Sequence, residues 1–177
     1  MIEETLRVPA DHPIRVLFRQ LTERGMSQLN LRDSETIQYI TNLLMEFVRA
    51  DNVGQINWDS GHSEQYLFRM MEQAETAVSP VLQRQCYRYL GDSILFQLGL
   101  FPESLTYGHR TVSLNYYAQT GRRSYIMVAE MDSSPGQTNL YRNLSRQFEQ
   151  CVVGLNWVKR YISDPFYQFM FREFPIS

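Results

Sequence analysis

Hydrophobic residues recur at intervals of three and four positions along almost the whole chain. The first example spans Ile14 to Leu21, and the longest runs from Tyr141 to Ile162. This spacing gathers apolar side chains on one side of an α-helix, whereas a half-buried β-strand needs strict alternation. No alternation of useful length occurs, and no internal repeat is apparent. We therefore expect an all-α fold.

Capping and helix-breaking residues divide this pattern into about seven helices of one bundle. The first helix is expected to begin beside Pro13 and to end near Gly25, and Ser34 caps the second. The fourth is expected to begin at Ser79-Pro80, where a cap precedes a proline, and to end near Gly99.

Several boundaries are expected from loop-forming residues. Residues 51–61 indicate a loop, and a fifth helix is expected to end at Thr120-Gly121. A shorter sixth helix follows across 125–131, and Ser133-Ser-Pro-Gly136 is the clearest connector in the chain. The long regular pattern of 141–162 predicts one continuous helix.

The length and composition favour a single domain over residues 1–177. The chain has 177 residues, of which 44% are hydrophobic, so it can bury a substantial core. No apolar stretch approaches the roughly 20 residues of a membrane span, and the N-terminus is acidic where a secretory signal is basic. The chain has only two cysteines, so the fold requires no disulfide framework. This favours a location in the reducing cytoplasm.

The basic residues are almost all arginine, with Lys159 the single lysine. Arginine suits phosphate binding, which raises the hypothesis of a nucleic-acid partner. However, the arginines are spread along the chain, and 19 acidic residues outnumber the 17 basic ones. A nucleic-acid-binding domain is typically strongly basic, so we expect no nucleic-acid partner.

The segment 87–103 holds the densest group of candidate functional residues. Asp92 stands inside an apolar helix beside Gly91, and glycine within a helix is unfavourable by about 1 kcal/mol relative to alanine. Under a functional interpretation, Gly91 lets a ligand approach and Asp92 holds a polar group of that ligand. Under a structural interpretation, two helices cross closely at Gly91, and Asp92 pairs with Arg88 one turn earlier.

Three segments carry aromatic, glycine and acidic residues in a distinctive order, namely Tyr39…Leu43-Leu44…Phe47, Tyr87-Arg88…Gly91-Asp92…Leu95-Phe96…Gly99…Phe101-Pro102-Glu103, and Tyr116-Tyr117…Gly121…Tyr125. In this order the chain resembles an uncharacterised family of bacterial all-helical proteins, over residues 31–158. The resemblance implies a bacterial, cytosolic helical domain. The family brings no established activity, cofactor or catalytic residue with it.

Further polar and aromatic side chains lie close to this segment in the sequence. Glu103 follows a proline, where a carboxylate either stabilises the start of a helix or accepts a proton. The neighbouring tyrosines either line a mostly apolar pocket or pack in the core with their hydroxyls at its rim. The residues expected to bind a ligand are Arg88, Asp92, Glu103, Arg110, Tyr117 and Tyr125.

The sequence predicts no metal site and no cofactor. His12, His62 and His109 are too far apart to form a recognised metal-binding motif, and no Glu-x-x-His motif occurs. Cys86 and Cys151 fall on the apolar faces of their helices, where a thiol behaves as a small hydrophobic group. No glycine-rich phosphate-binding loop is present.

The tail over residues 164–177 is strongly aromatic. If it forms a helix, apolar residues surround the helix on nearly every side, so one face can pack on the body while another needs a separate cover. A homodimer or another protein would provide that cover, and a groove of the same domain is the alternative. The expected interface residues are Phe166, Phe169, Met170 and Phe174.

These features favour a cytosolic, non-enzymatic binding protein, with a homodimer, a protein partner or an apolar small molecule as the bound species. The alternative is a cofactor-independent enzyme that uses an acid and a base inside the bundle. In that enzyme Asp92 or Glu103 would be the base and His109 the acid.

Overall fold

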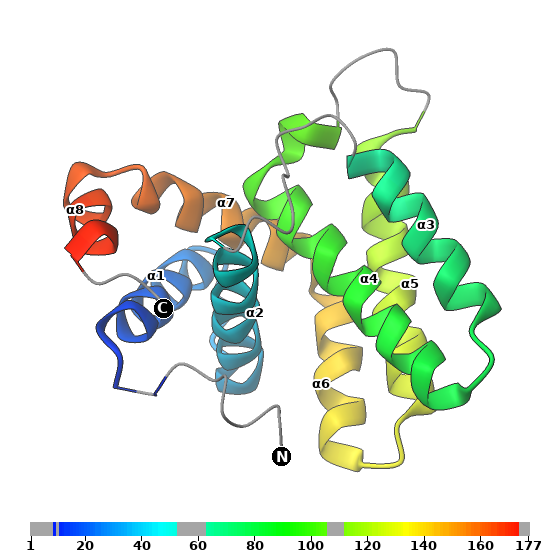
Figure 1. The fold of residues 1–177 in the computed structure, drawn as a ribbon. Helices are drawn as coiled ribbons and strands as arrows, with labels where there is room; N and C mark the ends of the chain where they lie inside the picture. Colours follow the sequence, from blue (N-terminus) through cyan, green and yellow to red (C-terminus); the bar gives the residue numbers. More distant parts are fainter. Residues whose placement is uncertain (1–8, 10, 53–62, 106–111, 174–177) are drawn as a thin grey trace. The chain divides into compact units, whose positions relative to one another are not determined.

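The computed structural model describes residue 9 and residues 11–52, 63–105 and 112–173, without the side chains of 48–52, 63, 64, 167, 170 and 171 (Figure 1). Within this part of the chain there are eight α-helices, one 3-10 helix and no strand. The all-α class expected from the sequence is confirmed. None of the described helices combines the length and the apolar character that crossing a bilayer requires.

The described elements follow this order along the chain. They are α1 (Pro13–Ser27), α2 (Ser34–Asn52), α3 (Ser63–Thr76), α4 (Pro80–Leu100), η1 (Pro102–Leu105), α5 (Leu114–Met131), α6 (Pro135–Arg146), α7 (Phe148–Ile162) and α8 (Pro165–Glu173).

The chain divides into two compact units. Unit 1 comprises Met1–Ile56 and Gly154–Ser177, and unit 2 comprises Asn57–Val153. The division falls inside α7, between Val153 and Gly154. The expectation of one domain over 1–177 stays a prediction.

In unit 1, α1 packs against α2 and crosses the second half of α7 very closely. A Cβ atom at Gly25 would lie 2.6 Å from the carbonyl oxygen of Gly154, and the sulfur of Met26 lies against Gly154 itself. The guanidinium of Arg24 lies 4.2 Å from the ring centroid of Tyr161 beside this crossing. The buried apolar core of unit 1 includes Ile14, Leu17, Phe18, Leu21, Ile40, Leu44, Leu155 and Val158.

In unit 2, α4 is the central helix, with α3 and α5 packed on it and α6 packed on α5 (Figure 1). All eleven residues from Leu90 to Leu100 are buried. The helix begins as its sequence predicts, because the backbone N–H of Leu82 donates to Ser79 Oγ at 3.1 Å and Pro80 occupies the first turn.

Two expected boundaries are wrong. The expected fifth and sixth helices form the single helix α5, which passes through Thr120 and Gly121. Gly121 is needed there because a Cβ would collide with the ring of Phe148, not because the chain turns. The expected helix over 141–162 is instead broken at Gln147, whose φ of −102° and ψ of 17° are not helical.

Other ends differ less from the expectation. α1 continues past Gly25 to Ser27, and α4 ends at Leu100 rather than Gly99. Asp51 and Asn52 of the expected 51–61 loop belong to α2, and the rest of that loop lies outside the described residues.

Replacing Gly25 by alanine is expected to lower the free energy of unfolding by about 2 kcal/mol, because the new methyl group meets the backbone oxygen of Gly154, which cannot turn away. Gly136→Ala is the matched control, since a Cβ there has no neighbour within 4 Å. That variant should gain roughly 0.4–1 kcal/mol. Urea denaturation measures both, and equal effects of the two substitutions would contradict the close crossing.

Candidate functional site

A buried pair of side chains joins α4 to α5 in unit 2. Asp92 on α4 is 4% exposed, and Tyr125 on α5 is fully buried. The hydroxyl of Tyr125 donates a hydrogen bond of 2.8 Å to Asp92 Oδ1. The Nε atom of Arg88, one helical turn before Asp92, lies 3.8 Å from Oδ2. One carboxylate oxygen of Asp92 therefore faces a hydrogen-bond donor, and the other faces a positive charge.

The ring of Tyr125 lies directly on Gly91. A Cβ at this glycine would lie 2.9 Å from Tyr125 Cε1, closer than side chains normally pack. The close crossing at Gly91 and the Arg88–Asp92 pair are the two contacts that the structural interpretation predicts. The hypothesis that the same cluster binds a ligand stays a prediction.

Electrostatics keep Tyr125 in its neutral form. Burial raises the pKa of its hydroxyl well above the ordinary value, and the negative charge of Asp92 raises it further. The hydroxyl therefore remains a hydrogen-bond donor at neutral pH. Arg88, with its side chain 44% exposed, is the part of the cluster that solvent reaches.

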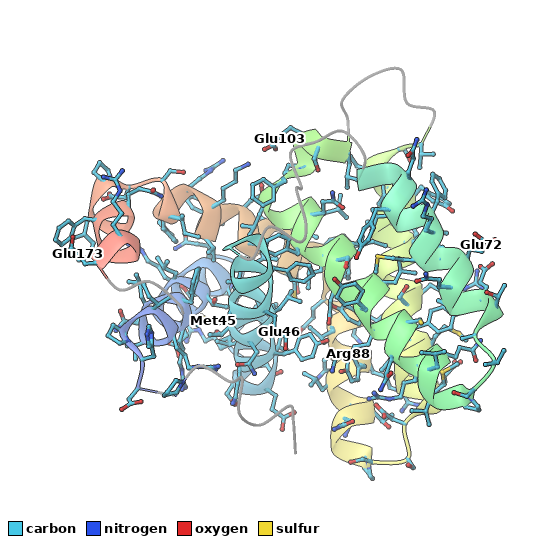
Figure 2. The ribbon with its side chains drawn as sticks, viewed as in Figure 1. Met45, Glu46, Glu72, Arg88, Glu103 and Glu173 are labelled. Carbon is cyan, nitrogen blue, oxygen red and sulfur yellow. The ribbon has the colours of Figure 1, made fainter. Side chains whose placement is uncertain are left out.

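Three other residues are expected to bind a ligand, namely Tyr117, Glu103 and Arg110. Tyr117 is fully buried in α5, with its ring centroid 5.8 Å from that of Tyr116. Glu103 is exposed in the first turn of η1, and Figure 2 shows it beyond the C-terminal end of α4, away from Arg88. Arg110 lies outside the described residues. The structure thus brings together Arg88, Asp92 and Tyr125, but not Glu103.

Two buried polar side chains of α4 were not singled out from the sequence. Ser93 and Gln97 are fully buried and one helical turn apart. Gln97 Nε2 donates to Ser104 Oγ at 3.2 Å, and that hydroxyl donates to the carbonyl of Phe101 at 2.7 Å. Among the described residues, Ser93 Oγ and Gln97 Oε1 have no hydrogen-bond partner. In the sequence, two polar residues four positions apart within an apolar stretch are the pattern that could have indicated this buried polar pair.

A small pocket of about 160 Å³ lies between α3 and α4. Cys86 is half-buried and lines this pocket. Its thiol is therefore not enclosed in the apolar core. The pocket has room for one apolar side chain or a ligand of similar size. Its lining residues are Met70, Gln73, Gln85, Cys86 and Tyr89.

In the described part of the chain, no three histidine, cysteine, aspartate or glutamate side chains are grouped closely enough to hold a metal ion. Cys86 and Cys151 are free thiols. His62 and His109 lie outside the described residues, and His12 caps α1 by accepting from the backbone N–H of Ile14 at 3.3 Å.

No protein-family model, curated protein or solved structure matches this chain. The resemblance to a bacterial all-helical family therefore stays a prediction.

The Tyr125–Asp92 hydrogen bond should have a measurable effect on stability. Tyr125→Phe is expected to lower the free energy of unfolding by about 1–3 kcal/mol, because a buried carboxylate oxygen loses its donor. Tyr116→Phe on the same helix is the matched control, since Tyr116 is 40% exposed. That substitution should change stability by less than about 0.5 kcal/mol. Thermal and urea unfolding test the pair, and equal losses would count against the buried bond.

Cys151 on α7 is fully buried. Burial, followed by the charge of Glu149, raises the pKa of its thiol from 9.0 to about 12. The folded protein therefore keeps this proton under alkaline conditions in which the unfolded chain loses it.

This difference predicts the sign of a pH effect. Because the folded-state pKa is raised, the contribution of Cys151 to stability is complete below about pH 9 and falls as the pH rises toward about 12. The fall is about 1.4 kcal/mol per pH unit. Cys151→Ala should remove this part of the slope in urea denaturation between about pH 9 and 11. An unchanged slope in the variant would show that other groups cause the alkaline destabilisation.

Proposed function

We propose that this protein functions by binding, and that it assembles as a homodimer through the exposed aromatic face of α8. The observation that supports the proposal is the exposure of two large aromatic side chains on this helix. Phe166 is 58% exposed and Phe169 is 57% exposed. Aromatic residues are enriched in protein interfaces, where they bury large areas with little loss of conformational freedom.

Hydrogen bonds fix the start of α8, so the two rings are presented by an ordered helix. Asp164 Oδ1 accepts from the backbone N–H of Phe166 at 2.9 Å, and the carbonyl of Asp164 accepts from the N–H of Gln168 at 3.1 Å. Gln168 Nε2 also donates to the carbonyl of Ile162 at 2.7 Å, which ties α8 to the end of α7. Because the helix is already formed, little free energy would be lost in ordering its backbone when a partner binds.

A second copy is the simplest partner for this face. In a two-fold dimer the same surface is used twice, so Phe166 and Phe169 of both copies become buried together. Full burial of an exposed ring is favourable by roughly 1.5–3 kcal/mol, and Phe166 and Phe169 each have a little over half of that surface left to bury. The side chain of Met170, and all of Phe174, lie outside the described residues, so their part in the interface stays a prediction.

The enzyme alternative has less support from the described residues. Asp92, its first candidate base, already accepts a hydrogen bond from Tyr125 and lies beside Arg88, so its carboxylate is engaged by groups of the protein itself. Its candidate acid, His109, lies outside the described residues. This alternative stays a hypothesis.

Sedimentation equilibrium over a concentration series tests the homodimer. We expect the wild type to be dimeric and a variant with both Phe166→Ser and Phe169→Ser to be monomeric yet folded, with a lower melting temperature because the stabilisation by association is lost. The matched control replaces two exposed apolar residues of unit 2, Val78 and Val81, by serine; they are 96% and 69% exposed. This control should remain dimeric.

A monomeric wild type at every concentration would overturn the homodimer. Dissociation by the Val78 and Val81 substitutions, but not by the α8 substitutions, would move the interface to the α3–α4 turn.

A further inference from the structure

A second candidate binding site lies in unit 1, in a surface pocket between α1 and α2. This α1–α2 pocket has a volume of about 320 Å³. Such a volume is at the lower end of the range for small-molecule sites. The residues that line it are Arg19, Glu23, Ser27, Leu31, Arg32, Ser34 and Ile37.

The turn between the two helices gives the pocket a fixed shape. Asn30 adopts a left-handed conformation with φ of 56°. The backbone N–H of Asn30 donates to the carbonyl of Ser27, and that of Leu31 donates to the carbonyl of Met26, each at 3.1 Å. These two bonds form a Schellman motif, which ends α1 and directs Leu31 inward.

The base of the pocket is apolar and its rim is polar. Leu31 and Ile37, which are only 3% and 8% exposed, form the base. Arg19, Arg32 and Ser34 are exposed. A ligand in this pocket would therefore contact hydrocarbon at one end and charged or hydroxyl groups at the other.

The rim offers positive charge that the described residues leave partly unused. Arg19 Nε donates to Glu23 Oε1 at 3.0 Å, and its two terminal nitrogens make no further bond within the described part of the chain. Arg32 makes no hydrogen bond or ion pair with any described residue. With two arginines and one glutamate, the pocket has a formal charge of +1.

Asp33, the acidic residue that follows Arg32 in the chain, is already engaged. Asp33 Oδ2 accepts from the backbone N–H of Thr36 at 3.0 Å and from its hydroxyl at 2.6 Å, so this carboxylate caps α2. It leaves Arg32 available for a ligand.

We propose that the α1–α2 pocket binds a small monocarboxylate with an apolar body. Arg32 and Arg19 bind the carboxylate, because a guanidinium offers parallel donors that match two carboxylate oxygens. Leu31 and Ile37 contact the apolar body. A single negative charge matches the pocket charge of +1, whereas a dianion would meet additional repulsion from Glu23. The site uses no residue of α8 and does not depend on dimer formation.

Octanoate is the probe for this proposal, in an NMR titration that follows backbone amide shifts of the full-length protein. We expect saturable shifts concentrated at residues 27–37. Octan-1-ol, which has the same chain without the charge, and octyl phosphate, which carries more charge, should each bind at least about tenfold more weakly.

Arg32→Gln and Arg19→Gln should each weaken octanoate binding about tenfold, since each removes a charged donor. Both positions are exposed, so the melting temperature should stay unchanged. Arg123→Gln on α5, another exposed arginine, is the matched control and should bind octanoate as the wild type does.

Four results would overturn the proposal. Three are shifts centred outside residues 27–37, equal affinity for octanoate and octan-1-ol, and wild-type affinity in both the Arg32 and the Arg19 variants. The fourth is tighter binding of octyl phosphate than of octanoate, which would reject the monocarboxylate in favour of a phosphate-bearing ligand.

Discussion

The contact of the Tyr125 ring with Gly91 determines how α4 and α5 pack in unit 2. The missing side chain lets the ring approach the backbone of α4, and the same approach places the hydroxyl 2.8 Å from Asp92. About two turns along the same pair, Arg84 near the start of α4 donates two hydrogen bonds to Asp132 at the end of α5, at 2.7 and 3.0 Å. The helix pair is therefore fixed at two levels, with a buried contact at one and a charged, partly exposed one at the other.

Helix starts could be predicted from the sequence because their signals are local. The cap of α4 at Ser79 needs only a serine and the proline after it, and both are visible in the sequence. Helix ends are harder to predict, since a glycine can either end a helix or allow another side chain to approach the helix closely. The sequence favours a helix end at Gly121, yet this residue is helical and makes room for Phe148, which lies 27 positions later in the chain. Such a contact leaves no local pattern.

The candidate sites show the same limit. The pairing of Arg88 with Asp92 could be anticipated because it follows helical spacing, whereas the partner on α5 could not be chosen among several tyrosines. The α1–α2 pocket could not be predicted from the sequence, because Arg19 and Arg32 resemble ordinary surface arginines there. The turn at left-handed Asn30 places Arg32 beside the α1 residue Arg19, and an asparagine in a loop is too frequent to signal this.

The division of unit 1 between both ends of the chain affects how the protein can form during synthesis. A ribosome releases α1 and α2 first, then all of unit 2, and only afterwards the second half of α7 with α8. The face of α1 around Gly25 must therefore remain without its partner at Gly154 while the intervening residues emerge. Unit 2 is continuous in sequence and can fold during that interval. Completion of unit 1 is then a late, long-range closure whose timing is set by translation.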